Sequence, residues 1–206
     1  MIHIVDDEEA LRDSLQWLLR TRDLPSRAFA SGEAFLAHAR SPLAAPETPG
    51  CILLDVRMDG MSGLELFERL AAESLCPAWP VIFLTGHGDV PMAVETLKLG
   101  AFDFVEKPFS DNSLVDRLAA ALEESRRRLE EARAAARREE SLASLTARER
   151  EILDLIVEGH YNKVIADRLG IAMRTVEVYR ARIFEKMGVR SAVELAALLA
   201  TRPREG

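Results

Sequence analysis

The sequence has few cysteines, no long apolar run and no signal-peptide pattern. Cys51 and Cys76 stand in apolar stretches and form no CxxC pair, so we predict two small buried side chains in a reducing cytoplasm. No segment approaches the roughly 18 apolar residues that a membrane span needs. The N-terminal residues lack the basic and apolar regions of a signal peptide. We therefore expect a cytoplasmic protein that contacts no membrane.

Net positive charge is also lacking, which taken alone argues against nucleic-acid binding. The 206 residues carry a net charge of −7. This charge is unevenly divided: residues 1–110 hold 9 Lys and Arg against 17 Asp and Glu, whereas residues 144–206 hold 11 against 9. The length suits two domains. A mildly basic C-terminal domain can bind phosphate groups if its charges lie on one face, so DNA binding there is permitted.

Residues 1–110 have the pattern of an α/β domain. Short apolar runs predict five strands, at 2–5, 26–29, 51–54, 81–85 and 102–106. Helical patterns lie between them at 8–22, 32–39, 62–75 and 90–99. Strands that alternate with helices at this spacing predict a doubly wound, five-stranded parallel sheet covered on both faces.

Residues 111–143 predict one long helix, which begins as the last helix of the first domain and then acts as a linker. The segment is rich in Ala, Arg, Glu and Leu, and from Asp111 onward no Gly or Pro occurs until Gly159. A heptad seam recurs at Leu118, Leu122, Ser125, Leu129, Ala132 and Ala136. Two interpretations follow, a dimeric coiled coil and a solvated spacer, because half of the seam is Ser or Ala.

Residues 144–206 predict a compact all-α domain of four helices, at 147–157, 162–169, 173–187 and 192–200. Thr146 followed by Glu149 is the pattern of a capping box at the start of the first of these helices. Gly170 predicts a tight turn between the second and third helices. Two helices joined by such a turn are typical of a helix-turn-helix.

Acidic residues and a lysine stand at the carboxyl ends of the predicted strands. Asp6 and Asp7 follow the first strand, Asp55 follows the third and Lys107 follows the fifth, while Thr85 ends the fourth. Ligands gather at this edge of an open parallel sheet. Crowded carboxylates repel one another unless a cation such as Mg²⁺ lies among them. Such an ion would neutralise the charge that develops when an acidic side chain attacks phosphorus.

Four segments resemble the receiver domains of two-component response regulators: Val5-Asp6-Asp7, Leu54-Asp55-Val56-Arg57-Met58, Thr85-Gly86-His87-Gly88-Asp89 and Phe104-Val105-Glu106-Lys107-Pro108-Phe109. The resemblance extends over nearly the whole chain, and it is to the FixJ subgroup of the FixJ/NarL family. It implies a flavodoxin-like receiver domain, which accepts a phosphoryl group from a sensor histidine kinase.

The resemblance also implies a role for each residue of the site. Asp55 would be the phosphoacceptor. Asp6, Asp7, Asp55 and the backbone carbonyl of Arg57 would hold Mg²⁺, with Mn²⁺ as an alternative. Lys107, aimed by a cis peptide before Pro108, would pair with the phosphoryl oxygens. Thr85 would donate its hydroxyl to the phosphoryl group, and Phe104 would turn inward as Thr85 moves.

One position departs from the receiver pattern. Receivers usually carry Pro after the residue that corresponds to Met58, and here Asp59-Gly60 follows, a flexible turn pair. Asp59 also adds a carboxylate near the expected metal. We expect a changed phosphoryl lifetime or Mg²⁺ affinity, but not the loss of phosphoryl acceptance. Comparing the autodephosphorylation rates of wild type and Asp59→Pro tests this hypothesis, and equal rates would reject it.

The C-terminal domain resembles LuxR-type helix-turn-helix domains at Asn162–Ala166 and Arg174–Arg180. On the 173–187 helix, Val176, Tyr179, Ile183 and Met187 recur at core spacing. The opposite side would face DNA. The resemblance implies base contacts from Glu177, Val178 and Ala181, and we expect phosphate contacts from Lys163, Arg174, Thr175 and Arg182, with Lys186 as a further candidate. Ala172 and Tyr161 replace the usual hydroxyl residues at two helix starts, and loss of a cap costs about 1 kcal/mol.

Together these patterns predict a DNA-binding response regulator rather than an enzyme. Phosphorylation of Asp55 would promote homodimerisation and binding to double-stranded promoter DNA, with RNA polymerase as a partner if the protein activates transcription. One alternative is a small phosphatase with an aspartyl nucleophile, but such enzymes usually carry a second Asp where this chain has Arg57. The other is a phosphorylation-independent binding module, and the complete set of site residues argues against it.

Overall fold

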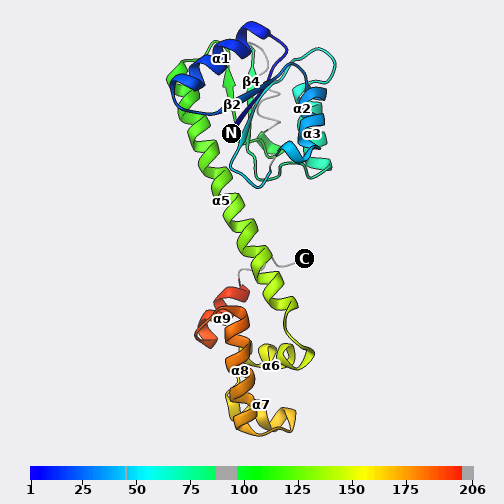
Figure 1. Ribbon diagram of the computed structural model, residues 1–206, viewed down its shortest axis with the longest axis vertical. Helices are drawn as coiled ribbons and strands as arrows, with labels where there is room; N and C mark the ends of the chain where they lie inside the picture. The colour runs from blue at the N-terminus through cyan, green and yellow to red at the C-terminus, as the bar shows by residue number, and fades with distance from the viewer. Residues whose placement is uncertain (45, 87–96, 201–206) are drawn as a thin grey trace. The chain divides into compact units, whose positions relative to one another are not determined.

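The computed structural model describes residues 1–44, 46–86 and 97–200, which fall into two compact units, 1–131 and 132–206. The first unit contains a parallel sheet (Figure 1), whose strand order is β2-β1-β3-β4-β5. The strands are β1 (Ile2–Val5), β2 (Ser26–Phe29), β3 (Cys51–Asp55), β4 (Val81–Thr85) and β5 (Asp103–Glu106). The helices are α1 (Glu9–Thr21), α2 (Gly32–Ala39) and α3 (Gly63–Ala72), with a 3-10 turn at Pro42–Ala44 and the start of α5 (Asp111–Ala143).

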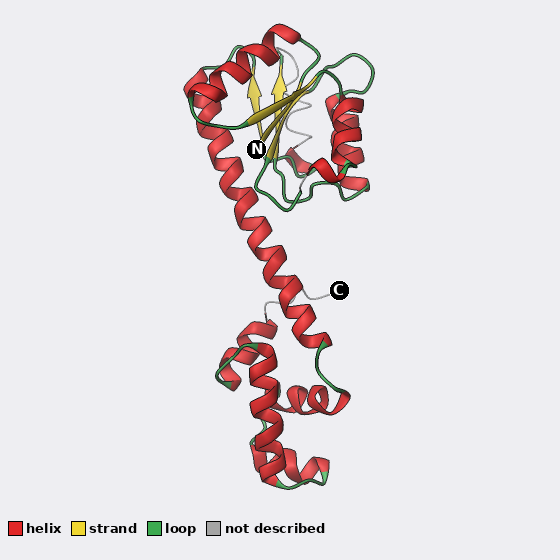
Figure 2. Cartoon of the chain, in the orientation of Figure 1, coloured by secondary structure: helices red, strands yellow, loops and turns green. Residues whose placement is uncertain are grey.

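Helices cover both faces of this sheet, so each face has its own apolar core (Figure 2). On one face α2 and α3 pack Phe35 and Leu66 against Phe83 of β4. On the other face α1 and α5 pack Leu19 and Leu118 against strand residues. All five residues of β3 are buried, as expected for a central strand covered on both sides. The doubly wound α/β fold is as predicted.

The long helix α5 begins and ends at the predicted residues, and the first half of its apolar seam is buried within the receiver unit. Leu118 and Leu122 are buried in the core of the first unit. Ser125 is fully buried, and its Oγ accepts a 3.1 Å hydrogen bond from the amide of Gly50. Ala132 and Ala136 are exposed. The first half of the seam is therefore occupied within the receiver unit and is not available to a second helix.

Up to residue 200, the second unit holds the end of α5 and four further helices, α6 (Ala147–Val157), α7 (Asn162–Leu169), α8 (Met173–Met187) and α9 (Ala192–Ala200), all with the predicted bounds. Thr146 and Glu149 form the predicted capping box. Gly170 ends α7 with a left-handed φ of 63°, which glycine adopts without strain. Neither Tyr161 nor Ala172 caps its helix with a side chain.

Element bounds in the first unit differ slightly from the predicted ones. Asp55 is the last residue of β3 rather than the first residue after it. Helix α3 is shorter than predicted at both ends, because Ser62 is its N-cap and Glu73 is its C-cap. Most of the helix predicted at 90–99 lies outside the described residues. Cys51 and Cys76 are both free and buried, as predicted. Within the described ranges, no helix combines the length and hydropathy that crossing a membrane requires.

Candidate functional site

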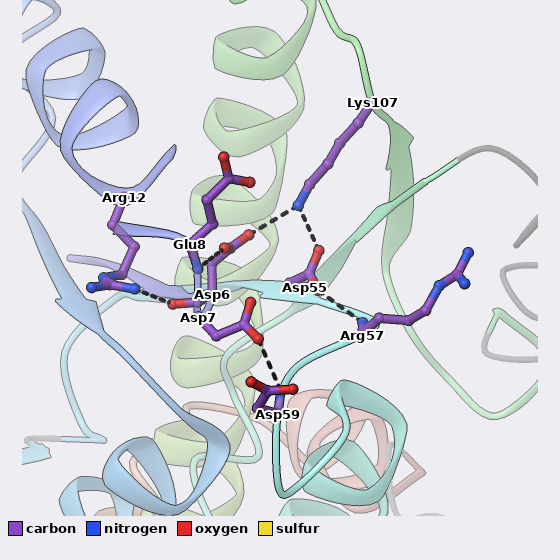
Figure 3. Close-up of polar contacts among 8 residues, drawn as sticks. All are labelled: Asp6, Asp7, Glu8, Arg12, Asp55, Arg57, Asp59 and Lys107. Atoms are coloured by element: carbon purple, nitrogen blue, oxygen red, sulfur yellow. Dashed lines mark hydrogen bonds and ion pairs between the residues drawn. The ribbon is translucent and has the colours of Figure 1, made fainter. Parts of the chain in front are cut away.

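Three charged side chains meet at the carboxyl edge of the sheet (Figure 3). Lys107 Nζ donates a 2.6 Å hydrogen bond to Oδ1 of Asp55 and a 3.0 Å bond to Oδ2 of Asp6. Asp6 follows β1, Asp55 ends β3 and Lys107 follows β5. The strand order reverses between β1 and β3, and ligands bind at this kind of switch point. The structure thus brings together three residues that the strand-end pattern had singled out.

Main-chain amides orient the two carboxylates. Asp55 Oδ2 accepts a 2.8 Å bond from the amide of Arg57, and Asp6 Oδ1 accepts a 2.8 Å bond from the amide of Glu8. Asp6 is 1% exposed and Asp55 is 7% exposed. Each carboxylate therefore has one oxygen fixed by the backbone and the other directed at the ammonium group of Lys107.

The charges of this cluster shift its pKa values. Burial is the main influence on Asp55 and raises the pKa of its carboxyl group, although Lys107 opposes the shift. Burial alone would lower the pKa of Lys107, but its hydrogen bonds to Asp55 and Asp6 outweigh that effect and raise it. Lys107 therefore stays protonated at neutral pH and supplies a fixed positive charge beside Asp55. The peptide bond before Pro108 is cis, as the resemblance implied.

The main chain after Asp55 turns closely into α3. Gly63 is the first residue of α3, and its amide donates a 3.0 Å bond to the carbonyl of Val56. A Cβ at position 63 would lie 2.1 Å from the carbonyl oxygen of Asp55. Only glycine permits this approach, so Gly63 lets α3 pack directly against the main chain of Asp55.

Asp7 has a different hydrogen-bond partner from the other two aspartates. Its side chain is exposed, and its Oδ2 accepts a 2.9 Å hydrogen bond from the amide of Asp59 (Figure 3). Within the described residues no three Asp, Glu, His or Cys side chains converge as a metal-binding group. The expected ligand set is therefore divided: Asp6 and Asp55 face Lys107, whereas Asp7 faces the loop between β3 and α3.

A second carboxylate, Glu33 of α2, holds the same loop, and the sequence patterns did not identify it. Its Oε1 accepts a 2.9 Å bond from the amide of Met61. Hydrogen bonds from its own main-chain amide and from Ser31 lower the pKa of Glu33. The contact joins residues that are 28 positions apart through a loop conformation, and no local motif predicts such a contact.

Thr85 and Phe104 lie on one face of two neighbouring strands. The Thr85 side chain is fully buried, and its Oγ1 has no hydrogen-bond partner within the described part of the chain. Phe83 and Thr85 are two residues apart on β4 and therefore share a face. Phe104 pairs in register with Phe83 and packs half-buried against the same core. The residues that were expected to act together as a switch are thus placed on the same face.

The residues expected to bind DNA are all at exposed positions of α7 and α8: Lys163, Arg174, Thr175, Glu177, Val178, Ala181, Arg182 and Lys186. On α8 the opposite face is the predicted core face, with Val176, Ile183 and Met187 buried and Tyr179 half-buried. The structure therefore separates the core face of α8 from the face expected to meet DNA.

Lys186 differs from the other expected DNA contacts, because its ammonium group has partners inside the domain. It donates a 2.7 Å bond to Oε2 of Glu149 and a 3.0 Å bond to the carbonyl of Ser144. Hydrogen bonds from Lys186 and from Thr146 lower the pKa of Glu149 to about 2. Lys186 thus links the C-terminal end of α8 to the capping box of α6.

Comparison with known proteins assigns both units to families. The response regulator receiver domain matches residues 2–119, and the luxR family of bacterial regulatory proteins matches residues 143–199. The chain is 54% identical over 199 residues to the C4-dicarboxylate transport transcriptional regulatory protein DctR of Rhodobacter capsulatus, which covers 96% of this chain and 98% of that protein. It is 45% identical over 201 residues to the transcriptional regulatory protein FixJ of Azorhizobium caulinodans, and this match covers 97% of this chain and 92% of that protein.

A solved structure agrees with these matches. The response regulator StyR superposes with a TM-score of 0.86 at 39% identity, over 98% of each chain. Fold, site and matches together define a class: the chain is a two-component response regulator with a LuxR-type DNA-binding domain. Within that class it belongs to the FixJ/NarL family, in the FixJ subgroup. Membership implies a sensor kinase and DNA as partners, and transcription regulation as the outcome.

Proposed function

We propose that Asp55 accepts a phosphoryl group from a phosphohistidine of a sensor histidine kinase. A carboxylate oxygen of Asp55 attacks phosphorus, the phosphorus–nitrogen bond breaks, and its electron pair leaves with the imidazole of the kinase. The observation that carries the proposal is the convergence of Lys107 on Asp55 and Asp6. A lysine so placed can follow the transferred group and neutralise its oxygens.

Asp6, Asp7, Asp55 and the backbone carbonyl of Arg57 would hold Mg²⁺, or Mn²⁺ in its place. All four donors are hard oxygens, which these ions prefer. Asp6 and Asp55 already share one cation, the Lys107 ammonium group, so their charges suit a cation between them. The metal would supply charge neutralisation as the phosphoryl group transfers.

The buried hydroxyl of Thr85 supports a switch that starts at the phosphoryl group. Thr85 Oγ1 can donate to a phosphoryl oxygen, which would give it the partner that it lacks among the described residues. Phe104 lies on the same face, so movement of Thr85 opens or fills space beside it. We propose that this rearrangement promotes homodimerisation, which brings two DNA-binding domains to a two-fold promoter site. RNA polymerase is a further partner if the protein activates transcription.

Treatment with acetyl phosphate or beryllofluoride and Mg²⁺ tests this function. With acetyl phosphate we expect wild type to gain one phosphoryl group by intact-mass spectrometry. With either reagent we expect it to dimerise by sedimentation and to bind promoter DNA more tightly. Asp55→Asn should do none of these, because the amide is a poor nucleophile. Dimerisation and DNA binding of unphosphorylated Asp55→Asn at the level of phosphorylated wild type would contradict the proposed switch.

Lys163 and Lys186 distinguish phosphate contacts from structural contacts in the DNA-binding domain. We propose that Lys163 contacts DNA phosphate, whereas Lys186 stabilises the domain through Glu149. Lys163→Met should reduce the slope of log DNA affinity against log salt concentration by about one unit. It should leave the urea midpoint of the domain unchanged. Lys186→Met should lower the urea midpoint of the domain and leave the slope unchanged. An exchange of these two outcomes would reverse the assignment.

A further inference from the structure

The loop between β3 and α3 is anchored by carboxylates from two other elements. The amide of Asp59 donates a 2.9 Å bond to Oδ2 of Asp7, which follows β1. Two residues later, the amide of Met61 donates a 2.9 Å bond to Oε1 of Glu33 in α2. Between them Gly60 has a left-handed φ of 79°, and a Cβ there would lie 2.9 Å from the same Glu33 oxygen. Three successive residues of the loop are therefore held in one conformation.

The first anchor exists because residue 59 is not proline. The usual proline of receivers at this position has no N–H group and could not donate to Asp7. Asp59 therefore acts on Asp7 through its main chain. The amide of Asp59 donates to the site, and the Asp59 side chain is exposed.

The Asp59 amide occupies one of the two carboxylate oxygens of Asp7. Among the described residues Asp7 forms no metal-binding group with Asp6 and Asp55, and its Oδ2 is held by the Asp59 amide (Figure 3). If Asp7 turns away from the loop to join the other two aspartates on one ion, it gives up this bond. An ionised acceptor makes a stronger hydrogen bond than a neutral one, so this bond opposes the turn.

We propose that the Asp59 amide competes with Mg²⁺ for Asp7, and that Glu33 is the positioning residue that holds this amide in place. The inference rests on the proposed magnesium site. Glu33 acts through Met61: as long as the Met61 amide is bound, the loop cannot follow Asp7 when Asp7 turns toward the metal. Loss of either anchor should therefore raise the affinity for Mg²⁺.

Two variants of residue 59 separate the amide from the side chain. Asp59→Pro and Asp59→Asn both remove the carboxylate, but only proline removes the N–H. In calorimetric titrations of the full chain with MgCl₂, we expect Asp59→Pro to bind roughly fivefold more tightly than Asp59→Asn, since one hydrogen bond to a carboxylate is lost as a competitor. Equal affinities of the two variants would overturn the proposal.

Glu33 is tested by loss and conservative replacement. Glu33→Ala should raise the Mg²⁺ affinity roughly twofold, because the loop is then held at one anchor instead of two. Glu33→Gln keeps an oxygen that can accept from Met61 and should restore the wild-type value. An affinity of Glu33→Ala equal to that of wild type would remove Glu33 from the mechanism.

Amide hydrogen exchange provides a readout on the wild-type chain. Saturating Mg²⁺ should accelerate exchange of the Asp59 amide, measured by NMR, and leave the Met61 amide protected. If the Asp59 amide stays protected with Mg²⁺ bound, Asp7 binds the amide and the ion at the same time. That result would overturn the proposed competition but leave the proposed metal site standing. Absence of any Mg²⁺ binding by wild type and variants would overturn the proposed metal site as well.

Discussion

At the scale of single residues, Gly63 supports the acceptor through a contact that no other residue permits. We predict that Gly63→Ala lowers the free energy of unfolding by roughly 2–3 kcal/mol, because the added methyl meets the Asp55 carbonyl and α3 must shift. Urea denaturation measures the loss, and phosphorylation by acetyl phosphate should slow in parallel.

Gly32→Ala is the matched control for this substitution. Gly32 is also the first residue of its helix, but the nearest atoms to a Cβ there belong to the side chain of Met61, at 3.2 Å, and not to backbone. Its loss of stability should be clearly smaller. Equal losses in the two variants would show that the contact with Asp55 has no special role.

His3 is a titratable residue inside the receiver core. It is 2% exposed, its ring stacks on Trp79 with centroids 4.3 Å apart, and its Nδ1 has no hydrogen-bond partner in the described part of the structure. Burial, followed by the nearby His38, lowers the pKa of His3 from 6.5 to about 4. The folded chain therefore keeps His3 neutral under mildly acidic conditions.

This pKa predicts a loss of stability in acid. Between pH 6.5 and pH 4 the unfolded chain binds a proton at His3 and the folded chain does not, so stability falls as the pH falls through this window. Full loss amounts to about 3 kcal/mol. His3→Phe keeps an aromatic ring beside Trp79. In urea denaturation at a series of pH values, it should remove the part of the fall in unfolding free energy that comes from His3. Parallel slopes for wild type and variant would contradict the prediction.

At the scale of elements, the long helix shows why periodicity alone could not assign its partner. The a/d pattern correctly marked Leu118, Leu122 and Ser125 as residues of one face, and all three are buried. They are buried against the receiver itself, and Gly50, which Ser125 binds, is 75 residues away in sequence. A heptad pattern describes a face of a helix and says nothing of what covers that face.

The seam therefore responds differently at its two ends to apolar substitution. We predict that Ser125→Leu, which completes the heptad, lowers the free energy of unfolding by roughly 1–3 kcal/mol through overpacking and leaves Gly50 without its acceptor. It should not produce a dimer in sedimentation experiments. Ala132→Leu, at an exposed position of the same seam, should leave stability nearly unchanged. A stable dimer of Ser125→Leu would restore the coiled-coil interpretation.

The same distinction explains how much of the site was predictable. Asp6, Asp55, Thr85 and Lys107 were identified because each stands at a strand end, and parallel strands bring their ends to one edge. The bounds of α8 followed from a clear apolar period. The contacts of Asp59 with Asp7 and of Glu33 with Met61 depend on loop conformation, which period and propensity do not determine. The engagement of Lys186 with Glu149 likewise joins two helices that the pattern treated separately.

At the scale of the whole molecule, charge is divided between the domains, since residues 1–110 are acidic and residues 144–206 mildly basic. If phosphorylation pairs two chains on DNA, the number of phosphate contacts doubles. We therefore predict that the slope of log affinity against log salt roughly doubles on treatment with beryllofluoride. Fluorescence anisotropy on labelled promoter DNA at several salt concentrations measures the slope. An unchanged slope with tighter binding would indicate a better-ordered monomer instead of a dimer.

The tryptophans and tyrosines of the chain are divided between its two units, which has a spectroscopic consequence. Both tryptophans, Trp17 and Trp79, belong to residues 1–131, and both tyrosines, Tyr161 and Tyr179, belong to residues 132–206. Trp17 is 60% exposed and Trp79 is 3% exposed, so their fluorescence emission maxima should lie at different wavelengths. Unlabelled protein thus carries a probe in each unit. Tryptophan emission reports on the receiver, and Trp79, which stacks on His3, should be quenched as His3 gains a proton. Tyrosine absorbance reports on the DNA-binding domain.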